Sequence, residues 1–180
     1  MSIPWQIQHF EEVSSTNSLL MEAAKSGSPE GLVFVADYQS EGRGKPGNQW
    51  ISPRGQNLLC SVLLRPMSTV DQAPIITLVT CKSIANLLQV AYGLESSVKL
   101  PNDVLVSGKK ICGVLTETYS QSDIIQAAVI GIGFNVNATQ DELPETATSL
   151  KISCGKSFDI QAVLRRILEK IDSDAQIFCH

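Results

Sequence analysis

Residues Gln39–Trp50 read Gln-Ser-Glu-Gly-Arg-Gly-Lys-Pro-Gly-Asn-Gln-Trp, and they follow the apolar run Leu32–Ala36. The apolar run predicts a buried strand, and the glycines and Pro46 predict a loop directly after it. Backbone N–H groups of a glycine-rich loop can approach an anion closely, while Arg43 and Lys45 add positive charge. The stretch therefore predicts a strand followed by a loop that holds a negatively charged ligand.

Two familiar nucleotide-binding motifs resemble this loop but do not fit it. Gly42-x-Gly44-x-x-Gly47 matches the dinucleotide-binding pattern, which requires a helix to begin at the glycines. Pro46 lies inside the pattern, and residues 48–53 do not read as a helix. A phosphate-binding P-loop requires glycine where Gln39 stands and Ser or Thr where Pro46 stands. We therefore expect neither motif.

Length and composition indicate one globular domain that spans residues 1–180. Apolar residues make up 43% of the chain, and the net charge of −4 argues against a nucleic-acid partner. The sequence predicts no membrane-spanning run and no signal peptide. The five cysteines form no C-x-x-C pair and are interpreted as reduced thiols. We expect a cytoplasmic protein with no membrane partner.

The hydrophobic pattern alternates between strand and helix periods along the chain. It predicts helices after Ser14, at Asp71–Tyr92 and at Asp159–Phe178, and a polar loop at 138–150. It predicts strands at 5–13, 32–38, 57–64, 104–106, 111–118 and 124–137, with a hairpin turn at 107–110. This order favours an α+β fold, with a mixed, largely antiparallel central sheet and helices packed on one face.

Polar residues at the start of the first helix have two compatible interpretations. Ser15, Thr16 and Asn17 are typical helix caps, and they also place hydrogen-bonding groups at a helix N-terminus, where a ligand can bind. Further along, Lys99-Leu100-Pro101-Asn102-Asp103 reads as a sharp break. The hairpin at 107–110 can then fold Lys110 back toward Asp103.

These segments, with Gly131–Asn137, resemble the catalytic domain of the biotin protein ligases when they are taken together and in this order. That family shows Ser-Thr-Asn, a Gly-Arg-Gly-Arg-x-Gly-Arg-x-Trp loop, Lys-Trp-Pro-Asn-Asp, a lysine before x-Gly-Ile-Leu-x-Glu, and Gly-x-Gly-x-Asn. The resemblance covers residues 10–175 and implies the biotin–lipoate ligase fold, which is similar to class II aminoacyl-tRNA synthetases.

The resemblance implies a two-step ligation. Biotin and MgATP would give biotinyl-5′-AMP, and biotin would then pass to one lysine of a biotin carboxyl carrier protein. Lys110 would contact the biotin carboxylate and the α-phosphate, Arg43 would lie in the loop over the intermediate, and Asp103 would orient the acceptor lysine. Asp103 also has the simpler interpretation of a turn residue.

The same residue-by-residue match implies the ligand contacts. The biotin site would comprise Ser15, Thr16, Asn17, Gln39, Gly42, Arg43, Gly44, Lys45, Lys110 and Gly113. The nucleotide side would comprise Trp50, Asn102, Gly133 and Asn135, where Trp50 alternatively packs in the core. No protein metal site is implied, because Mg²⁺ would be delivered with ATP.

The chain departs from the family pattern in several places. Lys45 and Asn48 replace arginines of the loop, and lysine lacks the bidentate geometry of arginine, so we expect more release of the intermediate. Leu100 replaces a tryptophan, a change expected to affect packing. We expect no N-terminal winged helix, hence no operator binding, and no C-terminal SH3-like barrel. Family members often dimerise, so a homodimer is possible.

Two alternatives remain. A lipoate or octanoate ligase of the same superfamily usually carries an Arg-Arg-x-Ser-Gly-Gly-Gly-Ala loop, which this sequence lacks. A non-catalytic homologue that only binds biotin would explain the altered loop, but storage of biotin requires no Lys110 at an α-phosphate. Biotin-dependent exchange of pyrophosphate into ATP separates an enzyme from a binder.

Overall fold

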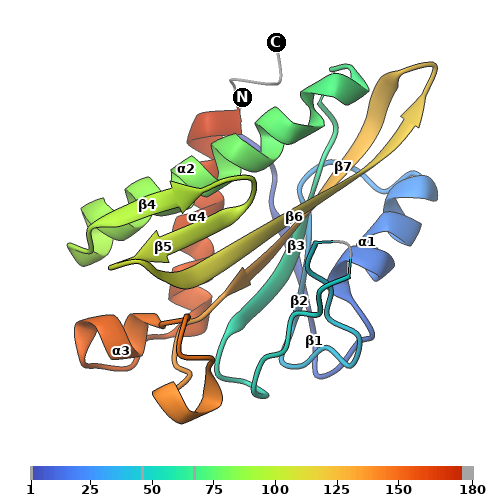
Figure 1. Ribbon diagram of the computed structural model, residues 1–180. Coiled ribbons are helices and arrows are strands. Elements are labelled where there is room, and N and C mark those ends of the chain that lie inside the picture. The colour runs from blue at the N-terminus through green and yellow to red at the C-terminus, as the bar shows by residue number, and fades with distance from the viewer. Residues whose placement is uncertain (1, 46, 67, 176–180) are drawn as a thin grey trace.

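The computed structural model describes residues 2–45, 47–66 and 68–175, which form one seven-stranded sheet with helices on both sides (Figure 1). The strands are β1 (Gln6–Phe10), β2 (Leu32–Ala36), β3 (Leu58–Leu64), β4 (Ser96–Lys99), β5 (Asp103–Val106), β6 (Lys109–Gln121) and β7 (Ile124–Phe134). The helices are α1 (Thr16–Lys25), α2 (Ala73–Tyr92), α3 (Leu150–Cys154) and α4 (Ile160–Ala175), with single 3₁₀ turns η1 (Val70–Gln72) and η2 (Gln140–Glu142).

The sheet is mixed and largely antiparallel, as the sequence predicts. Its strand order is β1-β2-β3-β7-β6-β5-β4. β1 and β2 pair in parallel, and each of the other neighbouring pairs is antiparallel. The long strands β6 and β7 form a hairpin at the centre of the sheet, so residues of these two strands lie beside elements from both halves of the chain.

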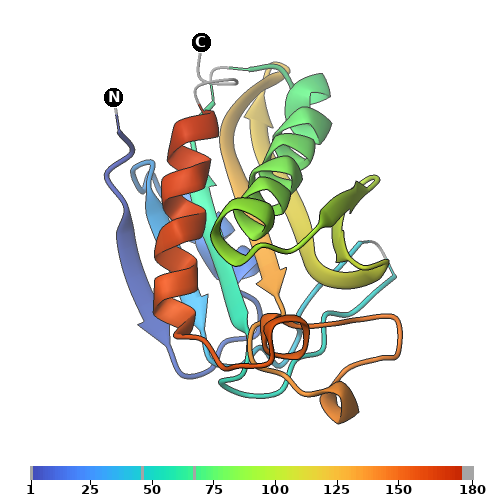
Figure 2. The same ribbon diagram turned by 90° about the vertical axis from the view of Figure 1, so that its left-hand side faces the viewer.

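Alternate residues of the central strands face two separate cores. Val33, Val62 and Ile130 pack with α2 and α4 on one face, which Figure 2 shows in front of the sheet. Leu63 and Val129 pack on the other face with α1. The expectation that the helices cover one face is therefore wrong for α1. The amphipathic pattern of a helix shows that it covers a sheet, but not which face it covers.

Several element boundaries differ from the sequence prediction. The hairpin turn is only Ser107–Gly108, both with positive φ, so Lys109 and Lys110 belong to β6. The segment 138–150 is not a plain polar loop, because it contains η2 and the first residue of α3. The last helix is described to Ala175, and the rest of the predicted helix at 159–178 lies outside the described residues.

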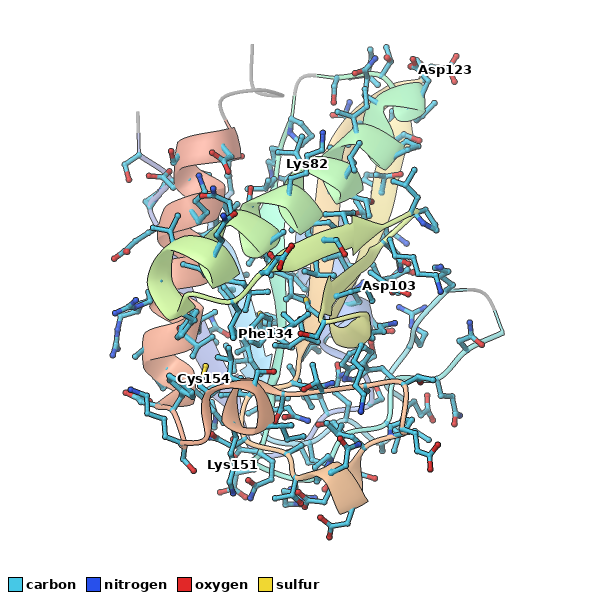
Figure 3. The ribbon with its side chains drawn as sticks, turned by 60° about the vertical axis from the view of Figure 1, so that its left-hand side comes forward. Lys82, Asp103, Asp123, Phe134, Lys151 and Cys154 are labelled. Atoms are coloured by element: carbon cyan, nitrogen blue, oxygen red, sulfur yellow. The ribbon has the colours of Figure 1, made fainter. Side chains whose placement is uncertain are left out.

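Helix α2 is the long, apolar helix of the larger core. Residues Val70–Tyr92, which are η1 and α2 together, reach the length of a membrane span and contain an 18-residue window with a mean hydropathy of 1.4. However, 44% of that window is buried within the protein, and α2 packs against α4 and β6. In Figure 3, Phe134 lies inside, between the sheet and the helices, while Lys82 points outward from α2. We interpret α2 as a core helix.

Candidate active site

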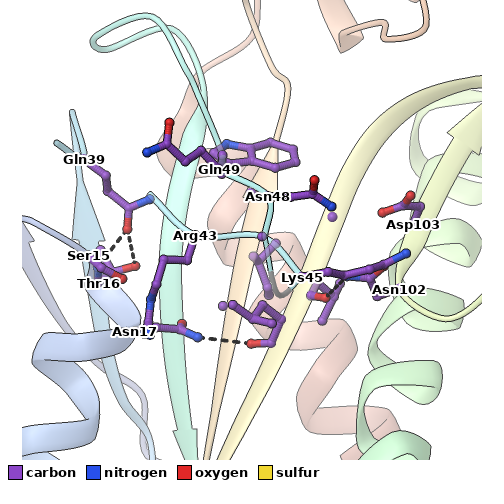
Figure 4. Close-up of a pocket in the computed structure, with 18 of the residues that line it drawn as sticks. Ser15, Thr16, Asn17, Gln39, Arg43, Lys45, Asn48, Gln49, Asn102 and Asp103 are labelled. Atoms are coloured by element: carbon purple, nitrogen blue, oxygen red, sulfur yellow. Dashed lines mark hydrogen bonds between the residues drawn. The ribbon is translucent and has the colours of Figure 1, made fainter. Parts of the chain in front are cut away.

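A cavity of about 620 Å³ opens on the sheet face that carries α1. Its walls come from separated parts of the chain: the start of α1, the loop after β2, one residue of β3, the turn between β4 and β5, and strands β6 and β7. Figure 4 shows polar side chains of these segments facing one another across the cavity. The segments that the sequence analysis singled out therefore converge in space.

Glycines make the floor of this cavity. On β7, Val129 packs against α1, but the next positions on the same face are Gly131 and Gly133. On β6, Gly113 lies directly opposite Gly133 in the ladder. A Cβ at Gly131 would lie 2.4 Å from Asn17 Oδ1. The sheet thus loses its side-chain layer where α1 begins, and this leaves room for a ligand.

The wall at the start of α1 is a buried hydrogen-bond network. Ser15 caps the helix by accepting a bond from the Ser18 N–H. Gln39 Oε1 accepts bonds from the Thr16 N–H at 2.7 Å and the Thr16 hydroxyl at 2.9 Å. Ser61 Oγ lies 2.6 Å from Asn17 Oδ1 and 2.7 Å from Thr16 Oγ1. Ser15 is therefore both a helix cap and a cavity residue.

This network contains fewer protons than contacts. Thr16 and Ser61 each have one hydroxyl proton, but their oxygens make three close contacts, with Gln39, with Asn17 and with each other. At least one of these contacts therefore lacks a proton. An oxygen of the network is therefore left free to accept a bond, and an N–H or O–H group of a ligand could donate to it.

The opposite wall carries the charged groups. Lys110 Nζ lies 2.7 Å from Asp103 Oδ1. The Lys110 backbone is fixed on both sides, because its N–H donates to Thr146 O and its carbonyl accepts from the Thr148 N–H. Arg43 and Lys45 line the cavity as well. The lining thus holds three cationic side chains and one carboxylate, which favours an anionic ligand.

The glycine-rich loop folds back on itself over the cavity. The Trp50 N–H donates to Gly42 O, and the Gly44 N–H donates to Asn48 O. A Cβ at Gly42 would lie 2.4 Å from Trp50 O, so only glycine permits this close pairing. Arg43 Nη2 then donates to Glu117 Oε2 of β6 at 2.8 Å.

Trp50 lies flat against the glycines of the floor. A Cβ at Gly133 would lie 2.4 Å from Trp50 Cε2, and a Cβ at Gly113 would lie 3.0 Å from Trp50 Cζ3. Lys110 Nζ lies 5.3 Å from the centre of the ring. Of the two sequence interpretations, a cavity residue and a core residue, this arrangement favours the first. The indole forms a wall of the cavity and packs the loop onto the sheet.

One cysteine lies beside the cavity. Cys60 of β3 borders it, but its side chain packs in the larger core on the opposite face of the sheet, and burial raises the pKa of its thiol to about 12. The thiol is therefore protonated at neutral pH and is a weak nucleophile. We therefore interpret Cys60 as a core residue and not as a nucleophile of the site.

The predicted site residues line this cavity, except Gly42 and Asn135. Gly42 lies behind the lining, where its carbonyl accepts a hydrogen bond from the Trp50 N–H. Asn135 is buried, and its side-chain amide donates to Thr148 O at 3.0 Å, so it braces the segment that holds the Lys110 backbone. Leu100 is 69% exposed, so its side chain contributes little to the core.

Sequence reasoning gave no individual role to Ser61, Gly131 or Glu117, which lie in or beside the site. Ser61 is a single polar residue in the fully buried strand β3. A buried polar side chain requires a hydrogen-bond partner, so its presence in an apolar strand could have indicated a site residue. Gly131 and Glu117 were seen only as parts of longer segments. Glu117 contacts both Asn17 and Arg43, and its position depends on the register of β6, which the sequence does not show.

Comparisons with known proteins agree with this arrangement. A model of the biotin/lipoate A/B protein ligase family matches residues 9–135. The bifunctional ligase/repressor BirA of Bacillus subtilis is 36% identical over 164 residues, which cover 89% of this chain and 50% of BirA. The biotin–[acetyl-CoA-carboxylase] ligase of Mycobacterium tuberculosis is 30% identical over 174 residues, which cover 93% of this chain and 63% of that enzyme.

A solved structure with bound ligands has a similar fold. The biotin protein ligase from Aquifex aeolicus, in complex with biotin and ATP, superimposes with a TM-score of 0.80 and 33% identity. The superposition covers 97% of this chain and 72% of that one. The chain spans about half the length of the BirA proteins it matches.

Proposed function

The chain belongs to the biotin/lipoate A/B protein ligase family, and from this membership and its cavity we propose that it activates biotin with ATP and transfers it to a lysine of a biotin carboxyl carrier protein. The observation that carries the proposal is the meeting of Lys110 and Arg43 in one cavity. They come from distant segments, and they face a buried polar wall that suits a ligand with N–H donors.

The first step joins two groups that repel each other. A carboxylate oxygen of biotin attacks the α-phosphorus of ATP, an O–P bond forms, and pyrophosphate leaves. Both partners are anionic, so cationic side chains must neutralise the charge that gathers between them. Lys110, whose backbone is held by hydrogen bonds on both sides, would contact the attacking carboxylate, and Arg43 and Lys45 of the loop would add positive charge.

The second step needs a neutral amine. The acceptor lysine attacks the carbonyl carbon of the mixed anhydride, an amide forms, and AMP leaves. Asp103 is only 15% exposed in its side chain and lies beside Lys110. It would therefore orient the incoming lysine and receive the proton that this amine loses. The loop and the Trp50 indole would shield the anhydride from water.

Asn102 supports a nucleotide at this end of the cavity. Its side-chain amide donates to Val114 O at 2.8 Å, while its Oδ1 is buried and has no hydrogen-bond partner among the described residues. Those residues contain no group of three His, Cys, Asp or Glu side chains that could hold a metal ion. Mg²⁺ carried by ATP would neutralise phosphate charge here, and Asn102 Oδ1 would help to hold it, directly or through a bound water.

The polar wall also favours biotin over lipoate. The ureido ring of biotin offers two N–H donors and a carbonyl acceptor, and the network at Thr16, Asn17 and Ser61 is short of protons. A dithiolane or an alkyl chain offers no such donors. Buried polar groups that stay unpaired would reject a lipoyl or octanoyl substrate.

The whole protein's partner and location form part of the same proposal. A carrier protein of an acetyl-CoA carboxylase would present the acceptor lysine, and the reaction would take place in the cytoplasm. A homodimer through a sheet edge is compatible with the fold, because β1 and β4 are the outer strands of the sheet. Sedimentation of the protein with and without biotin and ATP would test that assembly.

Exchange of labelled pyrophosphate into ATP tests the first step directly. We expect exchange that requires biotin and that falls at least about a hundredfold in Lys110→Ala, as expected for loss of a charged contact at the reacting atoms. Lys109→Ala is the matched control, because Lys109 is exposed and does not line the cavity. A protein that binds biotin but shows no exchange would be a non-catalytic binder, and exchange driven by lipoate instead of biotin would identify the lipoate alternative.

A further inference from the structure

The carboxylate of Glu117 joins two parts of the cavity that come from distant segments of the chain. Its Oε2 accepts a bond from Asn17 Nδ2 at 2.8 Å and a bond from Arg43 Nη2 at 2.8 Å. Asn17 belongs to the polar wall at the start of α1, and Arg43 belongs to the glycine-rich loop. A single oxygen atom thus contacts both sides of the cavity.

The position of Glu117 follows from the alternation of β6. Gly113, Leu115 and Glu117 point to the face that carries α1, whereas Val114 and Thr116 point to α2. Leu115 also accepts a bond from Asn17 Nδ2 through its carbonyl, at 3.2 Å. Asn17 is therefore oriented by two acceptors on the same strand, which leaves its Oδ1 directed at Ser61.

We propose that Glu117 is a positioning residue for the ligation proposed above, because it fastens the loop through Arg43 and orients the polar wall through Asn17. This inference rests on the proposed function. The contact lies at the end of the floor beyond Gly113 and Leu115, so the loop is held at Glu117 as well as at Trp50. Two separated anchors restrict how the loop can rotate over the cavity.

The two contacts of Glu117 differ in what they require. Arg43 is cationic, so its bond to Glu117 is an ion pair, and removal of the negative charge weakens it. Asn17 is neutral and needs only an acceptor oxygen. Glutamine at position 117 keeps an acceptor oxygen but has no charge, whereas leucine has neither. The variants Glu117→Gln and Glu117→Leu therefore separate the loop contact from the wall contact.

Limited digestion with trypsin, without any ligand, measures the loop contact. Arg43 and Glu117 have side chains that are 44% and 33% exposed, and partly exposed ion pairs contribute up to about 1 kcal/mol. We therefore expect Glu117→Gln to speed cleavage after Arg43 about three- to fivefold, and high salt to have the same effect on the unmodified protein. An unchanged rate of cleavage after Arg43 would overturn the proposal.

A second ion pair supplies the matched control. Glu12 pairs with Arg54 on the protein surface, away from the cavity lining. Glu12→Gln should speed cleavage after Arg54 and leave cleavage after Arg43 as it is in the unmodified protein. If Glu12→Gln and Glu117→Gln changed both cleavage sites equally, the effect would be a general loosening of the fold, and the assignment to Glu117 would be wrong.

The enzyme assays then test the positioning role. Glu117→Gln should release about three- to fivefold more biotinyl-AMP into solution with little change in the Kd of biotin, whereas Glu117→Leu should also raise that Kd. Combining Glu117→Gln with Arg43→Met should release no more intermediate than Arg43→Met alone. Full additivity would contradict the inference. Loss of biotin-dependent exchange in the unmodified protein would instead remove the proposed function, while the trypsin result would still stand.

Discussion

At the scale of single residues, the absence of side chains forms the cavity as much as their presence. Gly131 and Gly133 lie at positions of β7 where a methyl group would collide with Asn17 and with Trp50, respectively. Gly113 faces Gly133 across the ladder and leaves space for Lys110 and the indole. Glycines at these positions let the side chains of Asn17 and Trp50 approach the strand backbone closely. Any larger residue there would displace one of these side chains.

The substitution Gly133→Ala should therefore displace Trp50. A Cβ at this position would lie 2.4 Å from the indole, and the backbone of a central strand cannot yield, so the ring must leave the floor. In a Trp5→Phe background, Trp50 is the only remaining tryptophan. We expect its fluorescence to shift to the red and to become more accessible to acrylamide, with at least a tenfold loss of pyrophosphate exchange. An unchanged spectrum would show that Trp50 does not lie on Gly133.

At the scale of elements, the sequence located most strands and helices but not their spatial relations. Apolar runs identified β2, β3 and β7, and Gly93 marked the end of α2. The face that α1 covers and the pairing of Glu117 with Arg43 depend on strand register and on contacts between residues distant in sequence. Lys110 and Asp103 were expected to meet because one short hairpin links them, and they do.

Ser61 shows how an element supplies a site residue from within a buried strand. Ser61→Ala removes the hydroxyl that contacts Asn17 and Thr16. The polar side chains at the start of α1 then lose their link to β3. We expect the Kd of biotin, measured by calorimetry, to rise about tenfold, as for a lost buried hydrogen bond of about 1.4 kcal/mol.

Ser83 provides the matched control for this substitution. It is another buried serine, in α2, and it bonds Val79 O and Asp174 far from the cavity lining. Ser83→Ala should lower the free energy of unfolding while the Kd of biotin stays unchanged. Equal effects of the two substitutions on that Kd would mean that Ser61 acts only through stability.

At the scale of the whole molecule, the larger core contains several buried thiols. Burial raises the pKa of Cys60 and of Cys81 from the ordinary value of 9.0 to about 12, and raises the pKa of Cys112 well above that ordinary value. Above pH 9, the unfolded chain therefore loses thiol protons that the folded protein retains. The protein should be destabilised as the pH rises from 9 toward 12, and this contribution is fully favourable below pH 9.

The size of this effect can be measured by urea unfolding. Each such thiol contributes about 1.4 kcal/mol of destabilisation per pH unit between the unfolded and folded pKa values. Cys60→Ala should be less stable at pH 8 because it leaves a small cavity, but its stability should fall less steeply between pH 9 and 10.5. Cys154→Ala, at a partly exposed site, should keep most of the original slope. Identical slopes for all three proteins would contradict the assignment to Cys60.

The central claim is that Lys110 and the glycine-rich loop act together on the activated carboxyl group of biotin. The most direct test is the intact mass of a biotin carboxyl carrier domain after incubation with this protein, biotin and MgATP. The account predicts that the domain gains one biotinyl group, and that Lys110→Ala adds none while Lys109→Ala adds one. A carrier domain that stays unmodified here, although an established biotin protein ligase modifies it under the same conditions, would contradict the account.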